Sequence, residues 1–250
     1  LAALGVGLKQ RGHQVRLAAG DEFADLVSGA SLDFVPLGIQ LPRPIAQYKD
    51  FYQLVAAIRK NVIAAAGSGQ DAYISDFMGI AACTYARGLS VPYFFAGLIP
   101  GLPTRAFAHP LFKPRSLGGW YNLRTYRMAD TMALRNCPDA SCLLREPRPT
   151  YLYGFSEHVV PRPPEWEDYA HITGYWFLDR AAGYQPPAAL EAFLQKGPPP
   201  IVAGFGSAEP GQGRRTADLS QLNVTLFTPA ASTGTSPSGL MLSTSSPLGP

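Results

Sequence analysis

The sequence predicts an α/β fold with a mostly parallel sheet, and two observations lead to this prediction. Of the 250 residues, 46% are apolar and 16% are charged, a composition that suits buried sheet layers better than a charged helical bundle. Along the first hundred residues, segments with a helical spacing of apolar residues alternate with short strand-like runs. Such alternation is typical of βαβ units, whose strands run parallel.

The elements can be assigned in order from the apolar spacing and from the residues that end each segment. Residues 1–10 have the spacing of an apolar helix, and Gly12 stands where a helix ends. The strands expected next comprise residues 13–18, 32–37, 72–75 and 91–96. Helices are expected between them at residues 21–28, 48–66 and 79–87.

A proline-rich stretch interrupts this alternation at residues 97–117. Its four prolines and its aromatic side chains indicate a long ordered loop, of the kind that carries function or covers a site. Beyond it we expect a helix at residues 120–135, strands at 151–155 and 171–173, a helix at 186–196 and a buried strand at 201–205.

The last part of the sequence has a different composition. No charged residue follows Asp218, and 15 of the last 20 residues are Ser, Thr, Gly or Pro. A segment of this kind buries too little apolar surface to offset the entropy of ordering it. We therefore expect residues 208–250 to be disordered.

Composition and spacing argue against several functional classes. The net charge of +3 and the lack of a Lys/Arg-rich run do not favour nucleic acid as a partner. The four histidines and three cysteines show no ligand spacing, so no metal site is expected. Gly5 and Gly7 do not form a dinucleotide-binding fingerprint, because Gln10 stands where its third glycine belongs.

The cysteines and the apolar runs indicate the cellular location of the chain. Cys83, Cys137 and Cys142 form an odd set without a paired framework, which favours a reduced setting, with Cys137 and Cys142 as inert thiols at helix ends. The longest uncharged apolar run, residues 88–104, contains three prolines and is shorter than the ~20 residues of a spanning helix. We therefore expect a cytoplasmic location.

Four stretches carry a resemblance to a known family. Residues 102–112 read LPTRAFAHPLF, residues 153–163 read YGFSEHVVPRP, residues 171–177 read HITGYWF, and residues 198–207 read PPPIVAGFGS. In this order they resemble bacterial and fungal sterol-glucosyltransferase-like enzymes, which are glycosyltransferases with a family 28 N-terminal domain. The resemblance covers about residues 1–207.

This resemblance implies a GT-B fold, in which two Rossmann-like domains enclose the active site in the cleft between them. The N-terminal half would bind the acceptor, and the C-terminal half would bind a nucleotide sugar, UDP-glucose in most members. Transfer would be a single inverting displacement, in which a base deprotonates the acceptor hydroxyl and the nucleoside diphosphate leaves. No cofactor and no essential metal are implied.

The resemblance also implies a domain organisation. Residues 1–180 would form the acceptor-side domain, 181–200 a linker helix and proline-rich linker, 201–207 the first strand of the donor domain, and 208–250 a tail outside the family. The family's first strand and its base-bearing loop have no counterpart here, so we expect a chain truncated at both ends. Loss of a central strand would leave two strand edges unpaired.

Two positions are candidates for the reaction itself. Asp76 follows a predicted strand at its C-terminal end, which faces the ligand crevice in open α/β sheets. The resemblance implies that Asp76 orients the basic residue, whereas an N-cap of the following helix is the alternative. Gly206 and Ser207 match the family turn that faces the donor phosphates, where free backbone amides can meet an anion.

The resemblance places the acceptor beside the proline-rich loop. Arg105, Phe107, His109, Phe112 and Trp120 are the candidate acceptor-binding residues, because a sterol or lipid needs an apolar pocket. Ordinary core packing of the aromatic residues and a packed or solvated His109 are the alternatives.

The stretch from residue 115 to residue 148 carries six arginines and three acidic residues. Peripheral contact with an anionic membrane surface is one interpretation, and a solvated helix face is the other. Together these observations predict the acceptor-binding portion of an inverting glycosyltransferase that acts on a sterol, lipid or other apolar hydroxyl compound. A non-catalytic fragment or binding module from a disrupted glycosyltransferase gene is the alternative.

Overall fold

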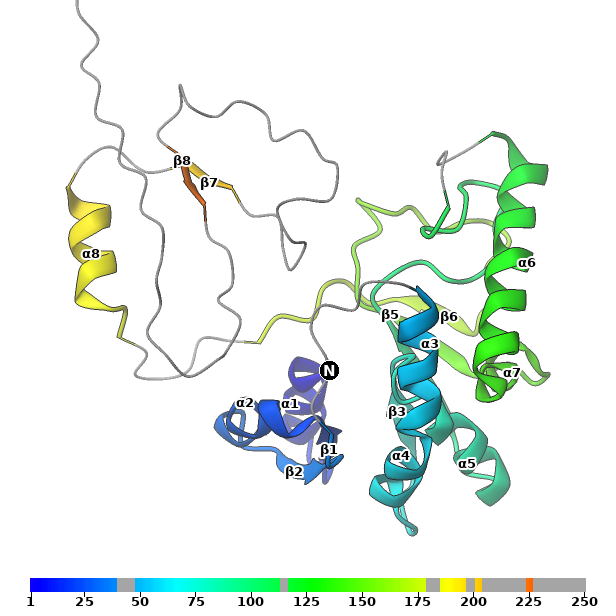
Figure 1. The fold of residues 1–250 in the computed structure, drawn as a ribbon, viewed down its shortest axis with the longest axis horizontal. Coiled ribbons are helices and arrows are strands. Elements are labelled where there is room, and N and C mark those ends of the chain that lie inside the picture. The colour runs from blue at the N-terminus through cyan, green and yellow to red at the C-terminus, as the bar shows by residue number, and fades with distance from the viewer. Residues whose placement is uncertain (40–47, 113–116, 179–184, 197–200, 204–223, 227–250) are drawn as a thin grey trace, which may run out of the picture. The chain divides into compact units, whose positions relative to one another are not determined.

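The computed structural model describes residues 1–39, 48–112, 117–178, 185–196, 201–203 and 224–226 (Figure 1). The chain divides into two compact units, residues 1–181 and residues 182–250, and each is described by itself. The roles assigned to these parts from the sequence stay predictions. Among the helices of the described residues, none combines the length and the apolar character needed to cross a bilayer.

The first unit opens with a small parallel sheet and its helices. Helix α1 (Ala2–Gln10) leads into strand β1 (Arg16–Ala19), which pairs in parallel with β2 (Asp33–Pro36). The 3₁₀ turn η1 (Asp21–Phe23) and helix α2 (Ala24–Gly29) form the connection between the two strands. Parallel pairing requires such a crossover, so the predicted βαβ unit is present here.

The segment predicted as one helix at residues 48–66 is two helices, which corrects that expectation. Helix α3 (Tyr48–Ala57) and helix α4 (Arg59–Ala66) meet at Ile58, whose ψ of −2° departs from the helical value. The turn lets both helices bury apolar side chains in the same core, since Val55, Ile58 and Val62 are all buried. Apolar spacing alone does not show a one-residue break of this kind.

The main sheet has four parallel strands in the order β3-β4-β5-β6 (Figure 1). They comprise β3 (Tyr73–Ser75), β4 (Tyr93–Gly97), β5 (Thr150–Tyr153) and β6 (Ala170–Ile172). Helix α5 (Ala81–Leu89) connects β3 to β4. Helix α6 (Gly119–Asn136), the 3₁₀ turn η2 (Pro138–Ala140) and helix α7 (Ser141–Leu144) connect β4 to β5. The predicted α/β fold with parallel pairing is therefore confirmed.

Tyr153 joins several segments at the centre of this unit. Its side chain is fully buried, and its ring stacks on Trp166 with centroids 4.9 Å apart. Its hydroxyl accepts a hydrogen bond from the backbone N–H of Leu102 in the proline-rich loop, at 3.1 Å. A Cβ at Gly97 of β4 would lie 2.9 Å from the ring, so the close approach of these strands requires glycine at that position.

The two sheets of the first unit do not join through backbone hydrogen bonds in the described residues. β1 and β3 are each the edge of their own sheet, and residues of both strands line one cavity. The side-chain amide of Asn61 in α4 donates to the Leu37 carbonyl at 2.6 Å and so ties the first sheet to the helices beside it.

The structure corrects the expectation that no cysteines pair. Cys83 in α5 forms a disulfide with Cys142 in α7, with Cα atoms 6.1 Å apart and 59 positions between them in sequence. Cys137 remains a buried free thiol. Helices α5 and α7 pack together only in the folded chain, so neither the odd cysteine count nor the wide spacing revealed this pair. The premise that the three cysteines form no pair is therefore wrong.

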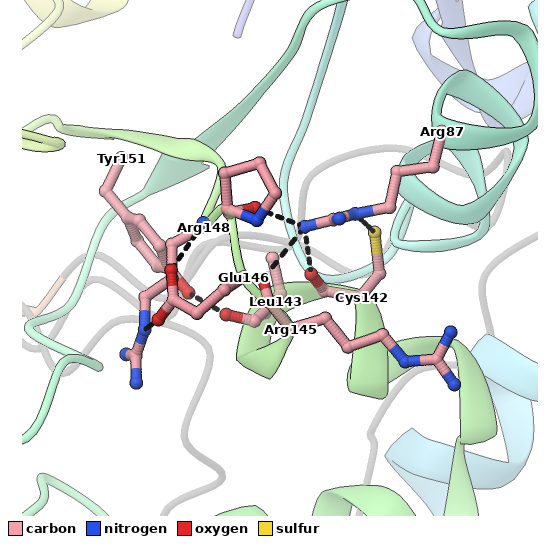
Figure 2. A network of polar contacts seen from close by, with 8 residues as sticks. Arg87, Cys142, Leu143, Arg145, Glu146, Arg148 and Tyr151 are labelled. Atoms are coloured by element: carbon pink, nitrogen blue, oxygen red, sulfur yellow. Dashed lines mark hydrogen bonds and ion pairs between the residues drawn. The ribbon is translucent and has the colours of Figure 1, made fainter.

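Arg87 fastens α5 to the segment that leads from α7 to β5 (Figure 2). Its Nη2 atom donates to the carbonyl oxygens of Cys142, Arg145 and Pro147 at 3.1, 3.0 and 2.7 Å. Its Nε atom lies 3.1 Å from the Cys142 sulfur. One guanidinium thus satisfies three carbonyls of a loop that contains the cis bond between Glu146 and Pro147.

The second unit contains helix α8 (Ala188–Gln195) and a two-stranded parallel sheet of β7 (Ile201–Ala203) and β8 (Val224–Leu226). β8 lies within residues 208–250, for which disorder stays a prediction. The other residues of 208–250 lie outside the described residues.

Replacement of Arg87 should destabilise the first unit. We expect Arg87→Met to lower the free energy of unfolding by about 2–4 kcal/mol, because three carbonyls lose a charged donor. Arg145→Met is the matched control, since the Arg145 side chain points away from this network in Figure 2 and its carbonyl is retained. Urea unfolding followed by circular dichroism measures both variants. Equal stability of the two variants would contradict the role of Arg87.

Reduction of the disulfide should also lower stability. Opening a loop of this length costs about 4 kcal/mol on the chain-entropy account, so dithiothreitol should lower the midpoint of urea unfolding. The double variant Cys83→Ala/Cys142→Ala is the control, and its midpoint should not respond to dithiothreitol. A wild-type midpoint that is equally insensitive would show that the two thiols do not pair in solution.

Candidate functional site

A cavity of about 430 Å³ lies between the free edges of β1 and β3. Every residue of β1 and of β3 lines it, and Gly20 and Asp76 lie just past the ends of those strands. Apolar residues complete the walls, among them Val27, Ile58, Val62, Ala66 and Ala82. The cavity therefore has polar backbone along two sides, apolar helices around it, and a carboxyl group at the C-terminal end of β3.

Asp76 lies at this end of the cavity, as its place after a parallel strand predicts. Its Oδ1 atom accepts a hydrogen bond from the backbone N–H of Gly79 at 3.2 Å. The N-cap residue of α5 is Ile80, so Asp76 stabilises the turn before the helix and is not its N-cap. Burial raises the pKa of the Asp76 carboxyl, and hydrogen bonds from Gly79 and Met78 oppose the rise.

The backbone around Asp76 is held by a neighbouring hydroxyl pair. Ser75 Oγ and Tyr93 Oη lie 2.7 Å apart, and Ser75 Oγ is also within hydrogen-bonding distance of the carbonyls of Asp76 and Gly79. A Cβ at Gly79 would lie 2.7 Å from the Ser75 Cβ, so the turn closes this tightly only with glycine. Desolvation raises the pKa of Tyr93, which keeps its hydroxyl protonated. Asp76 therefore projects from a fixed turn.

Glu165 anchors the proline-rich loop, a role that the sequence did not reveal. Its Oε2 accepts a hydrogen bond from the Thr104 hydroxyl at 3.0 Å, and its Oε1 accepts one from the Arg105 N–H at 3.1 Å. Burial raises the pKa of Glu165, but these hydrogen bonds hold it below its usual value. Asn122 of α6 donates to the Arg105 carbonyl at 2.7 Å from the other side. The loop is thus clamped at residues 104 and 105.

His109 belongs to this loop, and its side chain packs inward. Its side chain is 9% exposed, and its ring makes edge contacts with Tyr126 and Phe112 at 5.2 and 6.1 Å. Its backbone N–H donates to Thr125 Oγ1, and its Nδ1 accepts from the Leu111 N–H. Burial lowers the pKa of His109 to about 4, so the imidazole is neutral at pH 7. The geometry corresponds to the packed alternative, and an acceptor-binding role stays a prediction.

The other predicted acceptor residues do not gather at one place. Arg105 and Trp120 line a groove of about 630 Å³ along α6, and Trp120 is 74% exposed. Phe107 packs against the buried core, and Phe112 is half-buried beside His109. None of these five residues lines the cavity that contains Asp76. Gly206 and Ser207, the predicted donor-phosphate turn, lie outside the described residues.

The sequence of this chain is similar to the sequences of known enzymes. No family model matches the sequence. A sterol 3-beta-glucosyltransferase of Leptosphaeria maculans is 32% identical over 236 residues, which cover 80% of this chain and 16% of that protein. The Arabidopsis thaliana sterol 3-beta-glucosyltransferase UGT80A2 is 30% identical over 246 residues, which cover 82% of this chain and 38% of that protein. The chain is a homologue of the sterol 3-beta-glucosyltransferases.

A solved glycosyltransferase structure has a fold similar to that of this sterol 3-beta-glucosyltransferase homologue. The glycotransferase of kitacinnamycin superposes with a TM-score of 0.54 over 91% of this chain and 67% of that chain, at 14% sequence identity. The homologue therefore has the α/β architecture of GT-B glycosyltransferases, as predicted. It spans less than half the length of the two curated relatives described above.

The buried imidazole of His109 should make stability depend on pH. Its folded pKa is about 4 and its unfolded pKa about 6.5, so the unfolded chain binds the proton more readily. The stabilisation is complete above pH 6.5 and falls by about 3 kcal/mol as the pH drops to 4. His109→Asn retains an acceptor for the Leu111 N–H but does not titrate.

The difference in unfolding free energy between wild type and His109→Asn should therefore change by about this amount between pH 7 and pH 4. Urea titrations at several pH values measure it, and titrating groups common to both proteins cancel in the difference. A constant difference would show that His109 is not buried in its neutral form.

Proposed function

We propose that this chain forms the acceptor-side half of an inverting glycosyltransferase that moves a sugar from a nucleotide sugar to a sterol or another apolar hydroxyl acceptor. The observation that carries the proposal is the homology to sterol 3-beta-glucosyltransferases over about 80% of the chain. UDP-glucose is the proposed donor. An acceptor of this kind resides in a membrane, so peripheral membrane contact belongs to the proposal.

The reaction makes one bond and breaks one at the anomeric carbon, and it moves one proton. The acceptor oxygen attacks the anomeric carbon while the bond from that carbon to the diphosphate oxygen breaks, and the acceptor proton passes to a general base. We propose that Asp76 is a positioning residue that orients this base, since its turn is fixed by Gly79 and Ser75. The turn at Gly206 and Ser207 would receive the diphosphate through backbone amides.

A chimera tests this proposal. Residues 1–203 of this chain would replace the aligned part of the Arabidopsis thaliana relative, and steryl glucoside would be measured after incubation with radiolabelled UDP-glucose and sitosterol. We expect turnover by the chimera. Asp76→Asn should lower the rate at least about 100-fold, because an unoriented base takes the proton poorly. Asp71→Asn, an exposed position just before β3, should leave the rate unchanged.

Binding of the fluorescent sterol dehydroergosterol to the unmodified chain distinguishes the remaining outcomes. Sterol binding by the chain together with an inactive but folded chimera would favour the non-catalytic binding module. A chain that binds no sterol and a folded chimera that transfers no sugar would overturn the proposal. An Asp76→Asn chimera with full activity would remove the positioning role alone.

A further inference from the structure

Helix α6 has one face in the core and one face in solvent. The inner face contributes five buried residues: Asn122, Thr125, Tyr126, Ala129 and Ala133. The outer face combines large apolar side chains with arginines. Its exposed members are Trp120, Arg124, Arg127, Met128, Leu134 and Arg135. We call this set the outer face of α6.

The charge on this face has one sign. The groove of about 630 Å³ along α6 is lined by Arg105, Arg124, Arg127 and Arg135, and no carboxylate is among the residues that line it. The acid of α6, Asp130, is partly buried and faces Arg148. Glu165 lies beside Arg105 as a carboxylate whose oxygens accept hydrogen bonds from the Thr104 hydroxyl and the Arg105 N–H. The groove therefore presents the guanidinium groups of Arg124, Arg127 and Arg135 to an anionic partner, with Arg105 next to Glu165.

The apolar side chains decide which anionic partner fits. Trp120 is 74% exposed, Met128 is 47% exposed and Leu134 is 39% exposed, and Arg124 stacks over the Trp120 ring at 5.5 Å. Tryptophan and arginine together suit the boundary between lipid headgroups and acyl chains, where the ring enters the apolar layer and the guanidinium meets phosphate. A nucleic acid backbone would use the arginines but would gain little from Met128 and Leu134.

We propose that the outer face of α6 docks on an anionic phospholipid surface. Arg105, Arg124, Arg127 and Arg135 would contact lipid phosphates, and Trp120 and Met128 would enter the acyl boundary. The proposal rests on the peripheral membrane contact of the proposed function and deepens it by naming the surface, and it depends on no catalytic step. It identifies a surface, whereas the sequence predicted only an arginine-rich stretch.

Sedimentation with sucrose-loaded vesicles tests this docking. Vesicles of phosphatidylcholine alone would be compared with vesicles containing 30% phosphatidylserine, at 0.1 M NaCl. We expect the chain to bind the anionic vesicles at least about 10-fold more tightly. The triple variant Arg124→Gln/Arg127→Gln/Arg135→Gln should lose about 100-fold in affinity, since each basic residue contributes about 5-fold near such a surface.

A matched control separates this face from net charge. Arg11→Gln/Lys60→Gln/Arg145→Gln removes the same number of positive charges from exposed positions of the first unit outside the groove. It should lower vesicle binding less than about 3-fold, because those residues lie outside the docking face. Equal losses in the two triple variants would show attraction by net charge and would overturn the proposal.

A second variant tests the apolar contribution. Trp120→Ser/Met128→Ser should lower binding to anionic vesicles about 10-fold or more and should leave binding to a DNA duplex unchanged. Absence of anionic-vesicle binding by the wild-type chain would overturn the proposal. The proposal would also be overturned if vesicle binding required the arginines but not Trp120 and Met128, and if DNA competed with the vesicles for the chain. These measurements need no turnover, so their failure is distinct from failure of the proposed glycosyl transfer.

Discussion

The buried side chain of Tyr153 is the contact on which the arrangement of the four-stranded sheet and the proline-rich loop depends. Its ring lies between Gly97 of the neighbouring strand and Trp166 of the following segment, and its hydroxyl holds the loop at Leu102. One residue at the end of β5 thus contacts β4, the loop that follows β4 and the segment that leads to β6. The clamp that Glu165 forms on Thr104 depends on it, because Trp166 is the next residue in the chain.

The sequence predicted the elements that local pattern determines and missed features that form only on packing. Short apolar runs indicated the strands of the first unit, since a strand leaves a local pattern of apolar and β-branched residues bounded by turn residues. The break at Ile58 was missed because both helices place their apolar residues on one continuing side. The bond between Cys83 and Cys142 was missed because 59 positions separate the cysteines and only the fold brings α5 and α7 together.

The candidate site was predictable to a smaller extent. Asp76 lies at the cavity because the end of a parallel strand is a position that topology determines. The sequence position of His109 did not indicate where its ring lies, and the ring packs against Tyr126. Glu165 was not identified, because its interaction with Thr104 and Arg105 spans about 60 positions. The residue types indicated which chemistry the side chains could perform, whereas the topology was needed to place those side chains.

The unpaired edges of β1 and β3 determine how cooperatively the first unit unfolds. A continuous sheet transmits the loss of one strand to the next through its hydrogen-bond ladder, but these two sheets share no ladder in the described residues. The coupling between them runs through helix packing and the Asn61 amide. We therefore expect the N-terminal βαβ segment to behave as a separate foldon that opens at a lower free energy than the four-stranded sheet.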